Sequence, residues 1–147
     1  MKIALTCSHG GHLTEMFYLI DAFDGHDIFF ITYESFRTQT LNHKKYLLKN
    51  IDKNPFKMIL AFFKIFWILF KERPKVVVST GSEIAIPTLY IAKLMRIKTV
   101  FIESWCRVKN PSGAGRLVYD VSDIFLVQWP LLLNKYGDKT KYFGGVA

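Results

Sequence analysis

The sequence KIALTCSHGGHLTEM, residues 2–16, contains a short apolar run, a glycine-rich turn and the beginning of a segment with helical periodicity. From Leu13 to Phe23, apolar residues recur at close to the spacing of helix turns. An apolar run without polar alternation is typical of a strand buried on both faces, as in parallel sheets. This stretch therefore predicts a strand, a turn and a helix, which together are the first unit of an α/β fold.

The rest of the chain continues this alternation of strand and helix signals. The segments expected to be strands are Lys2–Cys7, Asp27–Thr32, Lys75–Ser79, Lys98–Glu103, Ile124–Gln128 and Lys141–Phe143. The segments expected to be helical are His12–Phe23, Pro55–Lys71, Ile84–Met95, Gly115–Asp120 and Leu131–Tyr136. The polar and basic segment Arg37–Asn50 gives no clear prediction. The pattern, without repeats or linkers, predicts a single Rossmann-like domain over residues 1–147, with a parallel sheet and helices on both faces.

Composition narrows the class of protein. The chain has 147 residues, of which 50% are hydrophobic, and its mean hydropathy is +0.16. These values are high for a soluble domain, so we expect part of the apolar surface to face something other than water. Two cysteines, Cys7 and Cys106, make no disulfide framework, and no Cys/His cluster has zinc-ligand spacing, so we expect a reducing compartment and no bound metal. The short apolar run at residues 1–7 is not expected to be a signal peptide.

The net charge of +8 is concentrated in one part of the chain. The segment Arg37–Lys75 has ten basic and two acidic residues, whereas basic and acidic residues balance in the rest of the chain. A local excess of this kind indicates a polyanionic partner at one region rather than a generally basic protein. Nucleic acid is disfavoured, because the chain has no base-stacking motif and no recognised nucleic-acid-binding fold. An anionic membrane surface is the partner that we expect.

An apolar helix is predicted inside this basic segment. Asn54 can cap it, Pro55 suits its first turn, and Pro74 stops it. Every residue from Phe56 to Phe70 is apolar except two lysines. These fifteen residues span roughly 22 Å as a helix, less than the roughly 30 Å of a bilayer core, so a single crossing is not expected.

Two interpretations of the Pro55–Lys71 helix are open. In the first, it is a core helix packed on the sheet, although a sheet covers only one face and leaves aromatic residues exposed. In the second, which we favour, it lies in a membrane interface with its lysines toward lipid phosphates. Lysines seven residues apart form one column on such a helix. The candidate membrane residues are Lys57, Phe63, Lys64, Trp67 and Lys71.

Polar and glycine-rich stretches follow three of the predicted strands, at Ser8–His12, Ser79–Glu83 and Glu103–Arg107. In folds of this class ligands bind at the carboxyl ends of the strands, so we expect the three stretches to converge on one rim. Gly10 and Gly11 precede a helix whose first N–H groups can hold a phosphate. The turn is neither a GxGxxG motif nor a Walker loop.

His12 is the candidate general base. Glu15 follows three residues later on the same face of the predicted helix, where its carboxylate can reach the imidazole and raise its basicity. The alternative is a histidine that only hydrogen-bonds the backbone, with Glu15 as a first-turn acid. A second alternative is a dinucleotide-binding module of an oxidoreductase or regulatory protein, in which Glu34 imitates the ribose-binding acid.

Six short motifs are spread, in order, along nearly the whole chain. They are Gly10–Met16 (GGHLTEM), Ser79–Pro87 (STGSEIAIP), Ile102–Val108 (IESWCRV), Pro111–Leu117 (PSGAGRL), Asp123–Trp129 (DIFLVQW) and Gly144–Gly145. This series resembles the PssD/CpsF family of capsular and exopolysaccharide proteins. That family includes the membrane-anchoring subunit of the eukaryotic UDP-N-acetylglucosamine transferase of dolichol-linked oligosaccharide assembly. The Gly-Gly-His turn also resembles that of MurG, a one-chain relative.

The resemblance implies the N-terminal half of a GT-B glycosyltransferase and a role in polysaccharide or oligosaccharide biosynthesis. Such a chain binds a lipid pyrophosphate-linked acceptor at the cytoplasmic face of the membrane. A separate donor-binding subunit supplies the UDP-sugar, so this chain alone is expected to bind no cofactor and to be inactive. Transfer proceeds with inversion and without a metal held by a family signature. We expect no transmembrane helix before the first strand, unlike in the eukaryotic members, so that Pro55–Lys71 would anchor the chain peripherally.

The resemblance also assigns roles to individual residues. It implies His12 as the base that deprotonates the acceptor hydroxyl, or as a group that holds the pyrophosphate, with Glu15 as its orienting partner. The residues implied in acceptor or phosphate binding are Ser8, Gly10, Gly11, Thr80, Gly81, Ser82, Glu103 and Arg107. Arg107 can pair with a phosphate or with Glu103. Gly113–Arg116 is a further candidate anion-binding turn, and Trp129 is either a core residue or a sugar platform.

Overall fold

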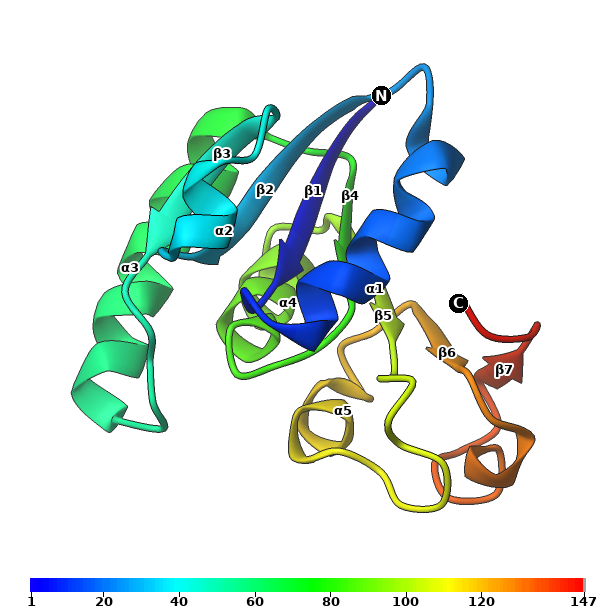
Figure 1. Ribbon diagram of the computed structural model, residues 1–147. Helices are drawn as coiled ribbons and strands as arrows, with labels where there is room; N and C mark the ends of the chain where they lie inside the picture. Colours follow the sequence, from blue (N-terminus) through cyan, green and yellow to red (C-terminus); the bar gives the residue numbers. More distant parts are fainter. Residues whose placement is uncertain (147) are drawn as a thin grey trace.

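The computed structural model describes residues 1–146 of the chain. Within these residues, seven strands form one parallel sheet in the order β3-β2-β1-β4-β5-β6-β7 (Figure 1). The strands are β1 (Lys2–Cys7), β2 (Asp27–Tyr33), β3 (Lys44–Leu48), β4 (Val76–Ser79), β5 (Lys98–Ile102), β6 (Ile124–Val127) and β7 (Thr140–Tyr142). The α-helices are α1 (Gly11–Leu19), α2 (Phe36–Gln39), α3 (Pro55–Glu72), α4 (Ala85–Leu94) and α5 (Gly113–Val118), and 3₁₀ turns occupy Ile20–Phe23 and Pro130–Leu132. The predicted Rossmann-like fold is confirmed.

Helices cover both faces of the sheet, as predicted. Consecutive residues of a strand point to opposite faces: Ala4 packs into the cluster beneath α3, α4 and α5, whereas Ile3 and Leu5 pack into the cluster beneath α1. Figure 1 shows α1 on one side of the sheet and the α3–α4 pair on the other. Burial on both faces explains why the central strands read as unbroken apolar runs.

Most differences between predicted and observed elements lie at the edges. The unassigned segment Arg37–Asn50 contains all but the first residue of α2 and the whole of the edge strand β3. Two exposed or half-buried lysines begin β3, and an edge strand has less apolar surface to signal it. The predicted helix Gly115–Asp120 begins two residues earlier, because the Ser112 hydroxyl accepts a hydrogen bond from Gly115 N at 2.9 Å and caps α5.

The order of the strands reverses between β1 and β4. From β1 the chain runs to β2 and β3 on one side, and the strands from β4 to β7 continue on the other. The loops that follow β1 and β4 therefore turn away from each other and leave a crevice between them at the carboxyl ends. This crevice is where the predicted polar stretches meet.

Helix α3 has two apolar faces. The Asn54 side chain caps its start by accepting from Phe56 N at 2.9 Å, and Arg73 ends it in a left-handed conformation with φ 48°. One face is buried against the sheet and α4, through Ala61, Ile65, Ile68 and Leu69. The opposite side, here called the outer face of α3, comprises Phe56, Ile59, Leu60, Phe62, Phe63, Phe66, Trp67 and Phe70, which are 37–80% exposed. The core interpretation thus describes one face of the helix, and the apolar residues of the other face are exposed.

Membrane crossing by this helix was not expected. Within residues 1–146, none of the helices combines the length and hydropathy that a bilayer crossing requires.

A buried carboxylate fastens the end of α3 to the sheet. Glu72, which is 6% exposed, forms ion pairs with Lys44 at 2.6 Å on β3 and Lys2 at 3.0 Å on β1, and accepts a hydrogen bond from the Tyr46 hydroxyl. Burial by itself raises the pKa of Glu72, but the bonds from Lys44, Tyr46 and Lys2 outweigh it and lower the pKa to about 2. Three elements are therefore joined by one charge.

We expect Glu72→Gln to lower the free energy of unfolding by about 2 kcal/mol at pH 7, a value reduced because both lysines are partly exposed. The folded pKa lies below that of the unfolded chain, so this contribution is complete above about pH 4.5 and is lost as the pH falls toward 2. Urea denaturation of both proteins at pH 7, 4 and 2.5 measures it. The exposed Asp138→Asn is the matched control, and a difference that persists undiminished at pH 2.5 contradicts the ion-pair explanation.

Candidate functional site

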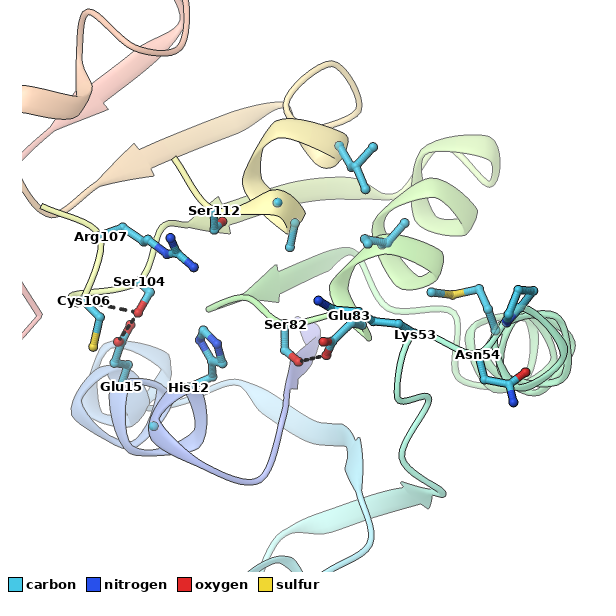
Figure 2. Close-up of a pocket in the computed structure, with 17 residues that line it drawn as sticks. His12, Glu15, Lys53, Asn54, Ser82, Glu83, Ser104, Cys106, Arg107 and Ser112 are labelled. Atoms are coloured by element: carbon cyan, nitrogen blue, oxygen red, sulfur yellow. Dashed lines mark hydrogen bonds between the residues drawn. The ribbon is translucent and has the colours of Figure 1, made fainter. Parts of the chain in front are cut away.

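A cavity of about 720 Å³ occupies the crevice at the carboxyl ends of the central strands (Figure 2). Its walls come from the start of α1, the segment before and at the start of α3, the loop after β4, and the loop after β5 with the start of α5. The polar and charged side chains among its walls are His12, Glu15, Lys53, Asn54, Ser82, Glu83, Ser104, Arg107 and Ser112. The expected convergence of three polar stretches on one rim is confirmed.

The ring of His12 is held by the backbone of the β4 loop. Its Nδ1 lies 2.8 Å from the carbonyl oxygen of Thr80, and the Thr80 hydroxyl donates back to the His12 carbonyl at 2.7 Å. A carbonyl oxygen only accepts, so Nδ1 must carry the hydrogen. In the neutral ring Nε2 is then the atom that takes up a proton. Because His12 lines the cavity, it is equipped to act as a general base there.

The close approach of this ring depends on a glycine. Gly81 has φ +119°, and a Cβ at this position would lie 2.9 Å from His12 Cε1 and 3.0 Å from Nδ1. Ser82 continues the turn with φ 80°, a conformation that non-glycine residues rarely adopt. The β4 loop is thus held in a strained shape directly against the imidazole.

The carboxylate of Glu83 lies in the cavity beside Ser82. The Ser82 hydroxyl donates to Glu83 at 2.6 Å. This hydrogen bond lowers the pKa of Glu83 against the effect of burial, and the positive charge of Lys53, with that of His12 when its ring is protonated, lowers it further. Glu83 is therefore held ionised, and it offers the cavity a fixed negative charge (Figure 2).

The prediction that Glu15 orients His12 is wrong. Glu15 is buried, and its carboxylate accepts from the Ser104 hydroxyl at 3.0 Å, Trp105 N at 3.0 Å and Gln128 Nε2 at 3.1 Å. Helical spacing placed it near the imidazole, but three donors from loops about 90 residues or more away satisfy it instead. Its role is to fix the loop that forms the cavity's wall after β5.

The prediction that Glu103 faces the rim is also wrong. Glu103 is 1% exposed and accepts from Ser104 N at 2.9 Å, from Ser112 N and Oγ at 3.0 Å each, and from the Tyr136 hydroxyl. Burial first, and then this carboxylate, raise the pKa of Tyr136. A fully hydrogen-bonded internal carboxylate neither binds a phosphate nor pairs with Arg107. It ties the β5 loop to α5.

The remaining candidates divide between the wall of the cavity and its support. Gly11, Ser82 and Arg107 line the cavity, and within residues 1–146 the Arg107 guanidinium makes no ion pair. Ser8, Gly10, Thr80 and Gly81 are not among the lining residues. The Gly10 carbonyl instead accepts from Arg37 at 3.1 Å.

Three further sequence expectations concern residues beside the cavity. Gly113 lines the cavity, but the start of its short helix is capped by Ser112. Trp129 does not line the cavity. Its indole N–H donates to the Trp105 carbonyl at 2.6 Å, and the centroids of the Trp129 and Trp105 rings are 4.6 Å apart. Glu34, the candidate ribose acid, is exposed outside the cavity and accepts from Gln39 at 3.3 Å.

Several lining residues were missed from the sequence. Lys53 and Asn54 follow the edge strand β3, whose mixed pattern gives no clear strand signal, so the sequence does not indicate that they follow a strand. Ser104 and Ser112 belong to the motifs Ile102–Val108 and Pro111–Leu117, but the sequence gives no sign that these two serines line the cavity. Glu83 immediately follows Ser82, and its carboxylate was the available signal.

Comparison with known proteins adds to this geometry. A family model described as "Oligosaccharide biosynthesis protein Alg14 like" matches residues 32–146. The chain belongs to this family. The rat UDP-N-acetylglucosamine transferase subunit ALG14 is 28% identical over 124 residues, which cover 74% of this chain and 57% of the rat protein. The human subunit of the same name is 30% identical over 98 residues, covering 63% and 45%. This Alg14-like chain thus spans about half the length of the curated relatives it matches.

Solved structures of low sequence identity share the fold. MurG of Acinetobacter baumannii superposes with a TM-score of 0.81 at 17% identity, over 99% of this chain and 45% of MurG. The UDP-GlcNAc 2-epimerase of Methanocaldococcus jannaschii superposes with a TM-score of 0.76 at 16% identity, over 99% of this chain and 47% of the epimerase. These likenesses confirm the predicted half of a GT-B architecture and show the fold alone.

We expect Gly81→Ala to displace the His12 ring, because its Cβ has no room beside Cε1 and its φ is unfavourable for alanine. The Nδ1 proton resonance of His12, protected by the Thr80 carbonyl, should shift or broaden in NMR spectra. Glu15→Gln is the matched comparison: it should leave that resonance in place while lowering stability by about 2 kcal/mol, since an amide group then faces three donors. The opposite pattern would restore Glu15 as the orienting group.

Proposed function

We propose that this Alg14-like chain is the acceptor-binding, membrane-associating subunit of an inverting two-subunit glycosyltransferase. The reaction moves a sugar from a UDP-sugar to a lipid pyrophosphate-linked acceptor in polysaccharide or oligosaccharide biosynthesis. The observation that carries the proposal is the His12 ring, fixed with Nε2 as its proton acceptor in a cavity at the carboxyl ends of the strands. Membership of the Alg14-like family supports it, as does the resemblance of the motif series to that of the PssD/CpsF proteins.

The proposed chemistry is a single displacement. The acceptor hydroxyl attacks the anomeric carbon of the donor as the bond from that carbon to the UDP oxygen breaks, and UDP leaves. His12 Nε2 takes the hydroxyl proton. The Thr80 carbonyl, already bonded to Nδ1–H, stabilises the positive charge that the ring then carries. Glu83 adds a negative charge in the same cavity.

Binding of the acceptor phosphates follows from the charges in the cavity. The start of α1 has no side-chain cap, so its first two N–H groups, at Gly11 and His12, remain available to an anion. Arg107 and Lys53 supply positive charge from two other walls. Together they suit a pyrophosphate, with the guanidinium able to bind two oxygens at once.

The donor site is proposed to lie on a second subunit. This proposal is supported by the names of the relatives, which are transferase subunits. The UDP-sugar would then bind to the partner, and the active site would form where the two subunits meet. This chain alone is proposed to bind no cofactor.

The outer face of α3 is proposed to lie in the membrane interface, at the cytoplasmic face. Lys57, Lys64 and Lys71 flank this face on one side, and the Lys71 ammonium lies 5.0 Å from the centre of the Trp67 ring. Such lysines can reach lipid phosphates while the aromatic side chains enter the acyl boundary. Pro55 and Met58, at the start of α3, also line the cavity. A lipid-linked acceptor would therefore reach His12 directly from the membrane surface.

Activity is expected only after reconstitution with the cognate donor-binding subunit. Transfer of labelled sugar to a lipid pyrophosphate acceptor is measured for this chain alone, for the partner alone and for the mixture. The mixture should be active and each component inactive. Turnover by this chain alone, or no turnover by a verified complex across a panel of UDP-sugars, removes the half-enzyme proposal.

His12→Ala tests the mechanism within that assay. It should lower kcat of the complex about 10²–10⁴-fold, the usual contribution of a positioned acid–base group, with little change in acceptor KM. A large rise in KM with a modest fall in kcat would instead assign His12 to pyrophosphate binding. The exposed His26→Ala is the matched control, and assembly of the complex must be unchanged in both variants.

Membrane binding is expected to be peripheral and partly sensitive to salt. Changing Lys57, Lys64 and Lys71 together to Glu should weaken flotation with anionic liposomes, because each basic residue near such a surface contributes about 1 kcal/mol. Phe63→Ser with Trp67→Ser should weaken flotation with neutral liposomes as well. The control replaces the exposed lysines at 109, 135 and 141 with Glu. Unchanged flotation of both α3 variants contradicts the interfacial role.

A further inference from the structure

A second hollow, of about 430 Å³, lies at the opposite end of α3 from the reaction cavity. We call it the basic notch. It is formed by the carboxyl ends of α3 and α4 and the short segments that lead into β4 and β5. Three cations line it, Arg73, Lys75 and Arg96, over an apolar floor that includes Phe70 and Met95. Among residues 1–146, no acidic residue lines it.

The charge of the basic notch is not neutralised within the described chain. None of the ion pairs among residues 1–146 includes Arg73, Lys75 or Arg96. The neighbouring carboxylate, Glu72, is already paired with Lys2 and Lys44. The carboxyl ends of α3 and α4 together supply about one negative charge through their dipoles. The three cations and the partial negative charges of the two helix ends together give the basic notch a net charge of about +2.

Both arginines occupy backbone positions that favour glycine. Arg73 has φ 48° and Arg96 has φ 60°, each just after the end of a helix. Glycine adopts this left-handed conformation without a steric cost, and it is the usual residue there. Two arginines at strained positions, facing one hollow, indicate a role for their side chains beyond ending the helices.

The basic notch is continuous with the outer face of α3. Phe70 belongs to that face, is 54% exposed and lines the notch, and the Arg73 guanidinium lies 5.3 Å from the centre of its ring. A phosphate in the notch would therefore sit at the depth at which the neighbouring aromatic side chains enter a bilayer. Phospholipid headgroups occupy that depth.

We propose that the basic notch binds the phosphate of an anionic membrane phospholipid, with a preference for a phosphomonoester headgroup. The two guanidinium groups and Lys75 contact the phosphate oxygens, and the acyl chains leave past Phe70. The proposal rests on the membrane role of α3 and adds a discrete lipid site about one helix length from His12. With the reaction cavity at one end of α3 and this site at the other, the helix is fixed in orientation at both ends.

The experiment compares vesicles of phosphatidylcholine containing either phosphatidic acid or phosphatidylserine, adjusted to equal surface charge. The native chain should bind the phosphatidic acid vesicles more tightly. Arg73→Gln, Lys75→Gln and Arg96→Gln together should remove this preference and weaken binding about tenfold or more, as expected for three cations at an anionic surface. The control, glutamine at the exposed lysines 109, 135 and 141, should keep the preference.

A second pair of variants separates binding from folding. Arg73→Gly and Arg96→Gly relieve two strained positions, so each should raise the melting temperature or leave it unchanged while weakening binding to phosphatidic acid vesicles. Loss of stability in both would assign the arginines to the fold and overturn the proposal. So would equal binding of the two vesicle types by the native chain.

Two further outcomes decide between a lipid and a free anion, and between this site and the membrane role of α3. Inorganic phosphate at millimolar concentration should not displace the vesicles; displacement would make the basic notch a soluble-phosphate site and overturn the lipid assignment. The α3 lysine-to-glutamate variant should weaken binding to both vesicle types equally. If the native chain binds neither vesicle type, both the membrane role of α3 and the notch proposal are rejected. If the native chain binds both types but shows no preference, only the notch proposal is rejected.

Discussion

The parallel pairing of β1 with β4 is the constraint on which the rest of the structure depends. It places Thr6 beside Ser79, so that the two loops which follow these strands begin at neighbouring points on one edge. His12 and Thr80 are 68 residues apart in the chain, and this pairing brings them within hydrogen-bonding distance. The strand order reverses at the same place, which opens the crevice. The imidazole, its orienting carbonyl and the cavity that the imidazole lines all follow from one strand contact.

The strands that are buried on both faces could be predicted from the sequence, whereas the edge strand β3 could not. The central strands are covered on both faces, and their unbroken apolar runs identified them, whereas the edge strand β3 has a mixed pattern and was missed. The position of the site followed from the rule that loops after parallel strands converge. The hydrogen-bond partners of its carboxylates did not, because local spacing says nothing of distant donors. Glu15 faces Ser104 and Glu103 faces Ser112, and neither contact has a sequence signal.

The three carboxylates in the site region differ in how many hydrogen-bond donors occupy them. Glu15 and Glu103 are buried and fully occupied by loop donors, so they determine where the β5 loop runs. Glu83 lies in the cavity itself, bonded only to the adjacent Ser82 hydroxyl among side chains. A buried carboxylate with three donors is a rigid anchor, whereas one with a single donor keeps lone pairs for a ligand. The sequence alone does not distinguish the two buried, fully hydrogen-bonded carboxylates from the one that lines the cavity.

The long separation between β1 and β4 also affects how the chain is made. Ile3 pairs with Val76, so the second edge of the first strand has no partner until more than seventy further residues have been synthesised. At 5–20 residues per second, that interval is roughly 4–15 s on the ribosome. The apolar helix α3 emerges within the same interval, before β4 can pair with β1 and complete the sheet on which it packs. A nascent chain therefore exposes an open strand edge and a row of phenylalanines at the same time, which makes early capture by a chaperone or by the membrane an advantage for this fold.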